Sequence, residues 1–447
     1  MLKRFTTENF LSFGQEVSFT MEPGRVRGKR DHVSELRNCN LLKFSAIYGS
    51  NAAGKSNYIY AMRFAREAIC HKMPKYTINK YHRVSAENKE KPTKFEFEIR
   101  LGRKQYRYAF SLNMNASTFL SESLIDCSTA KEKSIFKRDM TTGHKYIAGI
   151  SKNKSSNERI KAYLEDMEDD ASILFLNYMN HNKTKAYELI PELHVFKDVY
   201  GWFKNKLRII FPEEDSGGYS VEWFTSSGSD SICELLRNFG LNITNTDFEE
   251  VPFEAIFGNL PTAPPAKFLE DLKNDMLQTL QEAKKKDNKH ELTMKLRTDL
   301  FSVELDGEDS LITKRLQLVH GKNGRFNVSE ESDGTRRLIE LIDIFLNEED
   351  DITFIIDEID RSLHPLITKR FVELFLQTVK ERNRQLIVST HESRLLDLSF
   401  LRKDEIWFMT KTEGASTLDR LDSHDVRPDL KIDVAYLKGK IVQIPKW

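Results

Sequence analysis

Apolar residues in the first part of the chain change from an alternating to a helical spacing. Between residues 2 and 21 they alternate with polar residues on either side of a Ser-Phe-Gly-Gln turn, which predicts two strands joined by that turn. A short apolar run at residues 44–48 predicts a buried strand, and the spacing over residues 57–70 predicts a helix. Alternating runs at residues 95–101 and 106–112 predict a hairpin. The pattern indicates a mixed α/β region followed by antiparallel strands.

Residues 151–289 are more polar, and their apolar positions mostly follow helical spacing. Helices are expected at residues 158–167, 172–181 and 268–286, with a proline-rich break before the last of them. The helix at 268–286 is too short for a long coiled-coil arm, so we expect a short helical hairpin there. These residues are predicted to form an inserted, mostly helical lobe.

Strands and helices alternate in the last third of the chain. Short strands are expected at residues 292–296 and 316–319. Two continuous apolar runs, at residues 352–356 and 385–389, are typical of buried parallel strands, and residues 367–379 between them have helical spacing. Strand, helix and strand in this order predict a βαβ unit. We therefore expect three parts, which are residues 1–150, the inserted lobe at 151–290, and residues 291–447.

The composition is that of an ordinary soluble globular protein, with 39% hydrophobic and 30% charged residues among 447. The chain has 68 basic residues (lysine plus arginine) and 68 acidic residues (aspartate plus glutamate). It therefore lacks the excess of positive charge that is typical of proteins that bind nucleic acid over their whole surface. Cys39, Cys70, Cys127 and Cys233 lack Cys-x-x-Cys spacing, which argues against a disulfide framework or a zinc site. No apolar run approaches the roughly 18 to 20 residues of a membrane span, and the first residues lack a signal-peptide core. We expect a cytoplasmic protein without a membrane partner.

An octapeptide of the form Gly-x-x-x-x-Gly-Lys-Ser lies between the predicted strand at 44–48 and the helix that follows it. Its glycines let backbone N–H groups close around phosphates, Lys55 supplies a positive charge for the β and γ oxygens, and the Ser56 hydroxyl suits Mg²⁺. A glycine-rich turn that merely holds a lysine is the alternative, and the strand-and-helix context disfavours it. The expected nucleotide-binding residues are Gly49, Ser50, Asn51, Ala52, Ala53, Gly54, Lys55, Ser56 and Asn57.

Polar residues follow both of the predicted parallel strands in the last third. The strand at 352–356 ends in Asp357 and Glu358, which would hold Mg²⁺ and accept a proton from the attacking water, respectively. The next strand ends before His391, whose imidazole would lie beside the carboxylates and contact the γ-phosphate. An acidic turn and an idle histidine are the alternatives. The sequence thus predicts catalytic roles for Lys55, Glu358 and His391, and metal binding by Ser56 and Asp357.

A Ser-Asp-Gly-Thr-Arg-Arg segment begins at Ser332 and precedes a strongly apolar helix. A helix N-terminus with free N–H groups binds anions, so Ser332 and Gly334 are candidate contacts for a phosphate. Simple capping of the helix by Ser332 is the alternative, although it leaves Gly334 and the two arginines unexplained. His364 stands beside a proline at a helix start, and we expect a structural role for it.

These motifs occur together and in the same order in ATP-binding-cassette ATPases of the SMC, RecF and OLD type, which the chain resembles. The resemblance implies an α/β fold, namely an ABC-type ATPase head with a mixed sheet carrying the P-loop, an antiparallel N-terminal β subdomain and an inserted, mostly helical lobe. It assigns the N-terminal half of the head to residues 1–150, and the half with signature, Walker B, D-loop and H-switch to residues 291–447.

Within this group the chain looks most like the compact AAA-type ATPases of bacterial anti-phage systems, such as AbiL/RloA, PtuA and AriA. Its residues 436–445 are similar to a Tyr-Leu-x-Gly…Ile-Pro ending of the AbiL/RloA type. The chain departs from transporter-like cassettes in having Asp333 where a glycine is usual after the signature serine.

The resemblance implies a head-to-tail homodimer or higher homo-oligomer with ATP and Mg²⁺ as cofactors. ATP on residues 49–56 of one subunit would be capped by Ser332 and Gly334 of the other. Hydrolysis would open the dimer and regulate a separate effector, expected to be a nuclease, after a trigger that is a nucleic acid or a phage protein. Only about 55 residues follow His391, too few for the Toprim domain of OLD proteins, which is why we expect a separate effector.

Two alternative functions remain open on the sequence. A RecF- or SMC-like repair ATPase would bind double-stranded DNA through a basic groove, which the balanced charge and the lack of a long coiled coil disfavour. An autonomous nuclease would need a metal site in the inserted lobe, for which the carboxylates at 165–170 are the candidates. A run of carboxylates on a helix is more often a solvated face.

Overall fold

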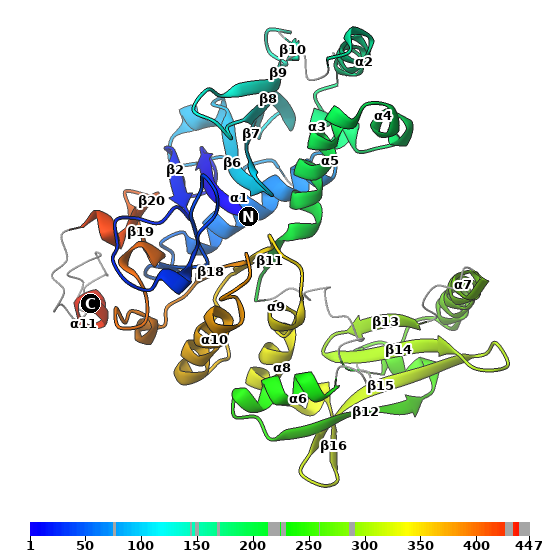
Figure 1. Ribbon diagram of the computed structural model, residues 1–447. Coiled ribbons are helices and arrows are strands. Elements are labelled where there is room, and N and C mark those ends of the chain that lie inside the picture. Colours follow the sequence, from blue (N-terminus) through cyan, green and yellow to red (C-terminus); the bar gives the residue numbers. More distant parts are fainter. Residues whose placement is uncertain are drawn as a thin grey trace. The chain divides into compact units, whose positions relative to one another are not determined.

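The computed structural model describes residues 1–74, 77–143, 145–147, 152–167, 170–212, 224, 229–258, 260–285, 291–424 and 432–437. The chain divides into two compact units (Figure 1). The first comprises Met1–Pro212, Glu349–Asp360 and Val372–Trp447, and the second comprises Glu213–Glu348 and Arg361–Phe371. The units divide the chain at different residues from the expected boundaries at 150 and 290, and that three-part division remains a prediction.

A six-stranded, mostly parallel sheet forms the centre of the first unit, with the strand order β11-β17-β18-β5-β19-β20. The strands are β5 (Phe44–Tyr48), β11 (Leu207–Ile210), β17 (Thr353–Ile356), β18 (Gln385–Ser389), β19 (Ile406–Thr412) and β20 (Ala415–Arg420). All neighbours pair in parallel except β20, which runs antiparallel to β19. β5, β17 and β18 are buried along their whole length, which explains their continuous apolar runs. The carboxyl ends of the parallel strands therefore share one edge.

A seven-stranded antiparallel sheet, in the order β10-β9-β8-β7-β6-β1-β2, forms the N-terminal β subdomain. Its strands are β1 (Leu2–Glu8), β2 (Val17–Thr20), β6 (Thr93–Leu101), β7 (Lys104–Asn113), β8 (Thr118–Asp126), β9 (Lys133–Asp139) and β10 (Lys145–Ile147). The predicted pairing of the first two strands and the hairpin of β6 with β7 are confirmed. One face packs on α1 (Lys55–Cys70), with the Phe5 and Tyr58 rings 5.4 Å apart. The predicted α/β fold with a mixed sheet and an antiparallel β subdomain is confirmed.

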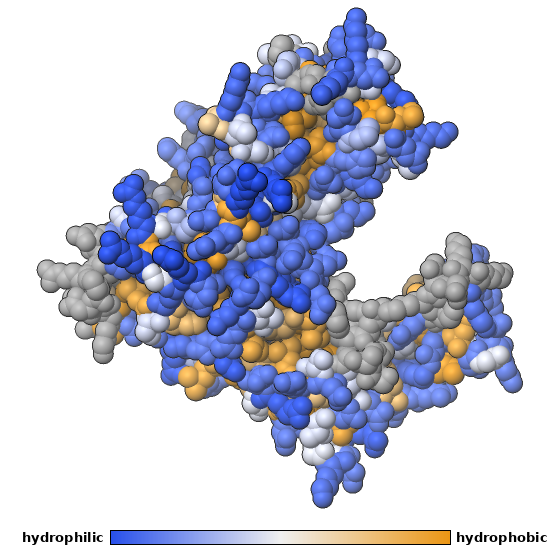
Figure 2. All heavy atoms as spheres, viewed as in Figure 1, coloured by the Kyte–Doolittle hydropathy of each residue, from blue (hydrophilic) through white to orange (hydrophobic). Residues whose placement is uncertain are grey.

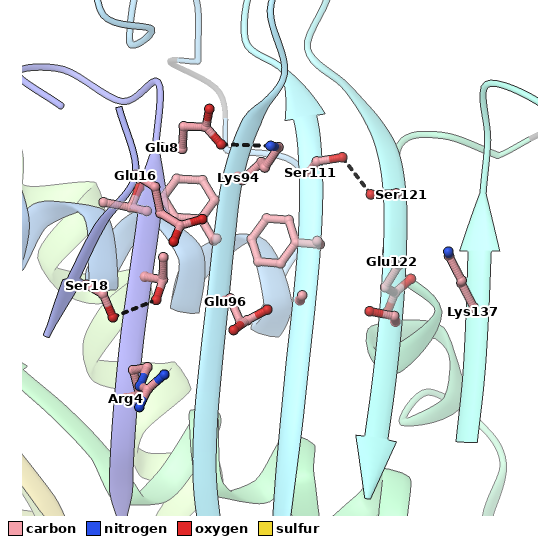
Figure 3. Close-up of a pocket in the computed structure, with 16 residues that line it drawn as sticks. Arg4, Glu8, Glu16, Ser18, Lys94, Glu96, Ser111, Ser121, Glu122 and Lys137 are labelled. Carbon is pink, nitrogen blue, oxygen red and sulfur yellow. Dashed lines mark hydrogen bonds and ion pairs between the residues drawn. The ribbon is translucent and has the colours of Figure 1, made fainter. Parts of the chain in front are cut away.

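The other face of the antiparallel sheet is polar and holds a shallow pocket of about 350 Å³ (Figure 3). Polar side chains there bond across strands, as Glu8 does with Lys94 (2.7 Å) and Ser111 with Ser121 (2.6 Å). Such cross-strand pairs stabilise a sheet that is apolar on one face and solvated on the other.

The remaining elements of the first unit are helices and short turns. Its helices are α2 (Lys154–Glu165), α3 (Phe175–Met179), α4 (Thr184–Leu189), α5 (His194–Gly201), α11 (Ile432–Leu437) and the C-terminal part of α10 (Pro365–Thr378). The unit also contains a short strand pair, β3 (Val33–Ser34) and β4 (Leu41–Leu42), and the π-helical turn η4 (Trp202–Lys206). Its 3-10 turns are η1 (Arg30–His32), η2 (Ala86–Lys89), η3 (Pro191–Leu193), η8 (Ser393–Leu395), η9 (Lys403–Glu405) and η10 (Leu421–Ser423). The predicted helices at 158–167 and 172–181 correspond to α2 and α3. The predicted βαβ unit is confirmed as β17, α10 and β18, because the two strands pair in parallel.

In the residues that the structure describes, the second unit combines an antiparallel sheet with the helices α6 to α9 and the N-terminal part of α10. The sheet has the order β12-β15-β14-β13, with β16 paired to β15. Its elements are β12 (Ile243–Val251), β13 (Glu291–Leu296), β14 (Asp299–Leu305), β15 (Leu311–His320), β16 (Gly324–Asn327), α6 (Ser229–Asn238), α7 (Ala266–Lys285), α8 (Asp333–Glu340), α9 (Asp343–Leu346) and the 3-10 turns η6 (Phe253–Phe257) and η7 (Val328–Glu330). The apolar helix predicted after Gly334 is thus two helices.

The helix predicted at 268–286 exists as α7, but the predicted helical hairpin is wrong. Leu272, Met276 and Leu280 belong to a core cluster with Phe301 and Val303 of β14, so the apolar stripe of α7 faces the sheet. α7 therefore packs against β13 and β14, which follow it in the chain, and not against a second helix. The apolar pattern of a helix does not reveal which element covers it.

No helix of the described ranges is long and apolar enough to cross a bilayer. Polar and charged side chains cover most of the face seen in Figure 2, as the share of charged residues leads us to expect. All four cysteines are free thiols.

Candidate functional site

The phosphate-loop octapeptide follows β5 at the shared edge of the parallel sheet. Two of its glycines are needed there because a side chain would collide with neighbouring atoms. A Cβ atom on Gly49 would lie 2.6 Å from the carbonyl oxygen of Met409, which real side chains do not approach so closely. Gly54 has a φ of +114°, and a Cβ there would also collide with the Ser416 hydroxyl. Glycine is the residue that tolerates both conditions. The loop backbone is therefore held close against its neighbours.

Hydrogen bonds from two distant segments fix the loop. The Ser416 hydroxyl of β20 donates to the Ala53 carbonyl (2.6 Å), and the Ser416 N–H donates to the Ser12 carbonyl (2.7 Å). The Asn57 amide in turn donates to the Ser12 hydroxyl (3.0 Å). The first N–H groups of α1 have no partner within the helix, so they remain available to an anion. The loop is preorganised for phosphate.

Lys55 is buried, with 5% of its surface exposed, and its ammonium group bonds within the loop. It donates to the carbonyls of Gly49 (2.9 Å) and Ser50 (3.3 Å) and lies 2.9 Å from Nε2 of His391. Burial lowers the pKa of Lys55 to about 8, although nearby carboxylates act in the opposite direction. The ammonium group is thus poised to exchange these bonds for those of a polyphosphate.

His391 faces Lys55 as a hydrogen-bond acceptor. Burial lowers the pKa of His391, and the positive charge of Lys55 lowers it further. The imidazole is therefore neutral near pH 7, with Nε2 free to accept from the lysine. The Asp360 carboxylate fixes the turn that carries it, because it accepts from the Thr390 hydroxyl (2.6 Å) and from the His391 N–H (3.3 Å).

The two carboxylates at the end of β17 are joined to β18 by Ser389. The Ser389 hydroxyl donates to the Asp357 carboxylate (2.5 Å) and accepts from the Glu358 N–H (2.8 Å). Asp357 is only 3% exposed, whereas Glu358 is partly exposed. Glu358 has a φ of +49°, an uncommon conformation for a residue other than glycine. Such conformations cluster at functional sites, and here it accompanies a carboxylate at a cavity wall.

A cavity of about 430 Å³ collects these groups. It is lined by residues 51–57 of the loop and α1 together with Glu358, His391 and Lys411. The structure therefore brings together the predicted Lys55, Ser56, Glu358 and His391, while Gly49 and Ser50 support Lys55 from the base of the loop. The predicted metal ligand Asp357 is buried and is not among the residues that line the cavity. Backbone N–H groups, a lysine, a hydroxyl and acidic oxygens are the donor set that a polyphosphate with Mg²⁺ requires.

Tyr436 of α11 lies under the loop. Its ring is 5.9 Å from that of Tyr48 and 5.7 Å from that of Phe408, and its hydroxyl is hydrogen-bonded to the Gly49 backbone. Burial raises the pKa of Tyr436, so the hydroxyl is neutral. The first residue of the 436–445 ending thus supports the phosphate loop, while residues 438–445 lie outside the described residues.

Ser332 and Gly334 lie in the second unit, at the start of α8. The Ser332 hydroxyl accepts from the Thr335 N–H (3.2 Å), so the predicted capping is confirmed. A Cβ on Gly334 would lie 3.0 Å from the Ser362 carbonyl, a tight fit that explains the glycine. Arg336 donates to two carbonyls of the preceding turn and pairs with the carboxylate at the helix start. The anion-binding role of this helix start remains a prediction.

The other sequence candidates have local roles. The His364 side chain accepts from the Leu366 N–H (3.3 Å) at the start of α10, in line with the structural role expected for it. In the acidic run at 165–170, residues 168 and 169 lie outside the described residues. Within the part of the chain that the structure describes, no group of three or more His, Cys, Asp or Glu side chains is arranged to hold a metal ion.

A family model described as "AAA domain, putative AbiEii toxin, Type IV TA system" matches residues 44–142 and 155–397, which is more than half of the chain. The chain belongs to this AAA family. The match includes the phosphate loop, the carboxylate pair and His391, so these residues belong to the P-loop ATPase domain of this family.

Solved structures similar to this AAA-family chain include SMC head domains. The SmcHead bound to the C-winged helix domain of ScpA has 13% identity and a TM-score of 0.40, over 94% of this chain and 97% of that one. The SMC head domain from Thermotoga maritima has 13% identity and a TM-score of 0.34, over 94% and 98%. The head domain with a coiled coil and joint derived from Pyrococcus yayanosii has 12% identity and a TM-score of 0.42, over 98% and 100%. Similarity at this level says nothing about ligands or partners. No curated protein sequence gives a significant match.

Five residues that line or support the cavity were not predicted from the sequence, namely Ser12, Asp360, Ser389, Lys411 and Ser416. Ser389 and Asp360 stood in the predicted segments, yet their partners are about 30 residues away, and the partners of Ser12 and Ser416 are farther still. The role of Ser389 could have been predicted, because β17 and β18 were expected to be parallel neighbours. The last residue of β18 can then reach the turn that follows β17. Nothing in the sequence distinguishes Lys411 from other lysines.

Proposed function

We propose that the chain is a Mg²⁺-dependent ATPase and that the cavity at the phosphate loop is its active site. The observation that carries this proposal is the convergence of Lys55, Glu358 and His391 on one cavity from three separate parts of the chain. Membership of a P-loop ATPase family supports it.

Each residue has a role in this proposal. Lys55 and the N–H groups of residues 51–57 bind the β- and γ-phosphates, and His391 contacts the γ-phosphate. Glu358 orients the attacking water and accepts its proton, since its carboxylate reaches the cavity. Ser56 and Asp357 would hold Mg²⁺, which neutralises developing charge on the phosphate oxygens when it is bound.

We further propose that the ATPase works as a head-to-tail homodimer or higher homo-oligomer. In this arrangement Ser332 and Gly334 of one subunit cover the ATP on the loop of the other. The start of α8 supports the proposal, because the first N–H groups of a helix carry partial positive charge. Charge stabilisation supplied by a second subunit can contribute roughly 10³ to 10⁵ in rate.

The proposed biological role is control of an effector in an anti-phage system of the AbiL/RloA, PtuA or AriA type. The effector is a separate protein, expected to be a nuclease, and a nucleic acid or a phage protein is the trigger. The toxin named in the family description supports a role in such a system. Co-purification of the chain with the product of an adjacent nuclease-like gene would support this role. A replication or repair neighbourhood with direct DNA binding would contradict it.

A mixing experiment tests the shared site. Lys55→Ala and Ser332→Arg chains should each lack ATP turnover, because one removes the lysine and the other obstructs the covering surface. In a random 1:1 mixture half of the dimers are mixed, and each holds one intact site, so we expect about a quarter of the wild-type activity. ATP binding by the Ser332→Arg chain serves as its folding control. A mixture that stays inactive, or a Ser332→Arg chain that is fully active alone, would contradict the shared site.

A further inference from the structure

Lys411 lies at the opposite side of the phosphate loop from the catalytic carboxylate. In the parallel sheet, β17 and β18, which carry Glu358 and His391, lie on one side of β5, and β19 lies on the other. Lys411 belongs to β19 and lines the same cavity. A nucleotide whose γ-phosphate reaches Glu358 and His391 must therefore extend its nucleoside end toward β19.

The strand register points the Lys411 side chain at the loop. Phe408 pairs with Tyr48, the last residue of β5, so Lys411 stands three residues beyond, at the level of the loop. Lys411 pairs directly with Ser416 in the antiparallel β19-β20 ladder, and residues opposite each other project to the same face. The Ser416 hydroxyl bonds to the Ala53 carbonyl of the loop, so this face is the loop side.

The charge of Lys411 is available for a ligand. The side chain is exposed, and it makes no hydrogen bond or ion pair with any residue that the structure describes. Lys55, by contrast, is buried at the loop and bonded to its carbonyls and to His391. The cavity thus has two lysines, Lys55 in the loop and Lys411 on the side of β19.

We propose that Lys411 contacts the α-phosphate of the bound nucleotide. This inference rests on the proposed function, because it assumes that ATP occupies the loop. A flexible lysine supplies a point charge, which suits an oxygen of the α-phosphate beside the loop. The α-phosphate is common to ATP and ADP and does not react, so Lys411 stabilises the bound ground state and the transition state equally. It is a binding residue that affects nucleotide affinity and leaves the chemical step unchanged.

Binding of ADP and of inorganic pyrophosphate separates the two ends of the site. Replacement of Lys411 by alanine should raise the Kd for ADP about fivefold or more, since a hydrogen bond to a charged group is lost. Pyrophosphate has no α-phosphate and no nucleoside, and we expect Lys55 and the loop to hold it in the β- and γ-phosphate positions, so its Kd should change by less than about twofold. The kcat should likewise stay within about twofold of the wild type. Lys411→Arg keeps the charge and should restore ADP affinity.

Lys104→Ala is the matched control, because Lys104 is an exposed lysine at the start of β7 in the same unit and is not among the residues that line the cavity. Unchanged ADP affinity in Lys411→Ala would overturn the inference, as would an equal loss for ADP and pyrophosphate or an equal loss in Lys104→Ala. These results differ from failure of the proposed function, in which the wild-type protein binds no nucleotide or Lys55→Ala binds it as well as the wild type.

Discussion

Nucleotide binding should weaken as the pH rises through 8, because Lys55 loses its charge in that range. Burial places the pKa of Lys55 at about 8 instead of 10.5. At pH 7 about nine-tenths of the molecules carry the charge, and at pH 9 about one-tenth do. If the charged form is the one that binds, the Kd for ADP rises about tenfold between these values, which is about 1.4 kcal/mol. A lysine with an ordinary pKa would change the Kd by only a few per cent.

Neither His391 nor the phosphate groups of the ligand produce this dependence. The pKa of His391 is lowered below 6.5, so its imidazole stays neutral from pH 7 to 9. Phosphate groups with a second pKa near 6 are largely ionised above pH 7. The rise of the Kd with pH is therefore attributed to Lys55, because its deprotonation removes an attraction for phosphate.

Calorimetric titration with ADP, without Mg²⁺ and at constant ionic strength, measures the effect. Lys55→Arg is the control, because arginine stays charged over the whole range. Its absolute affinity for ADP is expected to differ, but its Kd should vary less than about twofold from pH 7 to 9. A wild-type Kd that is constant over this range, or a tenfold rise in Lys55→Arg, would show that the charge of Lys55 does not control ADP binding. Detection of the Lys55 ammonium by NMR gives its pKa independently.

Two further substitutions test the support of the site. Ser389→Ala removes the donor to Asp357 and should lower the free energy of unfolding by about 1 to 3 kcal/mol in chemical denaturation, because a buried carboxylate loses its partner. Ser123→Ala, on the polar face of the antiparallel sheet, should change it by less than about 0.5 kcal/mol. Tyr436→Phe keeps the ring but removes the hydroxyl that bonds to the loop backbone, so the Kd for ADP should rise about two- to fivefold in the same calorimetric assay. Unchanged stability in Ser389→Ala, or unchanged affinity in Tyr436→Phe, would contradict these assignments.

The parallel core could be predicted because its strands carry their own signal. The runs that became β5, β17 and β18 are continuous and apolar, since both faces of each strand are buried. Residues that directly follow such strands are delivered to one edge, which is why Lys55, Glu358 and His391 could be expected at one cavity.

Features that depend on distant partners could not be predicted. The apolar stripe of α7 specifies a buried face but not its partner, which proved to be β14. The Ser12 carbonyl accepts from the Ser416 N–H, and the Ser12 hydroxyl accepts from the Asn57 amide. The side chain of Lys411 lines the cavity because of the register in which β19 pairs with β20. Periodicity describes one segment at a time, so contacts between separate segments leave no trace in it.

Steady-state turnover of the Glu358→Gln chain tests whether Glu358 is the base that drives ATP hydrolysis. Glutamine keeps the size of the side chain and removes the base, which contributes about 10² to 10⁴ in rate. ATP hydrolysis should fall by that factor, with ATP affinity within about threefold of the wild type. Hydrolysis by Glu358→Gln at the wild-type rate would show that the carboxylate at the end of β17 is not the base.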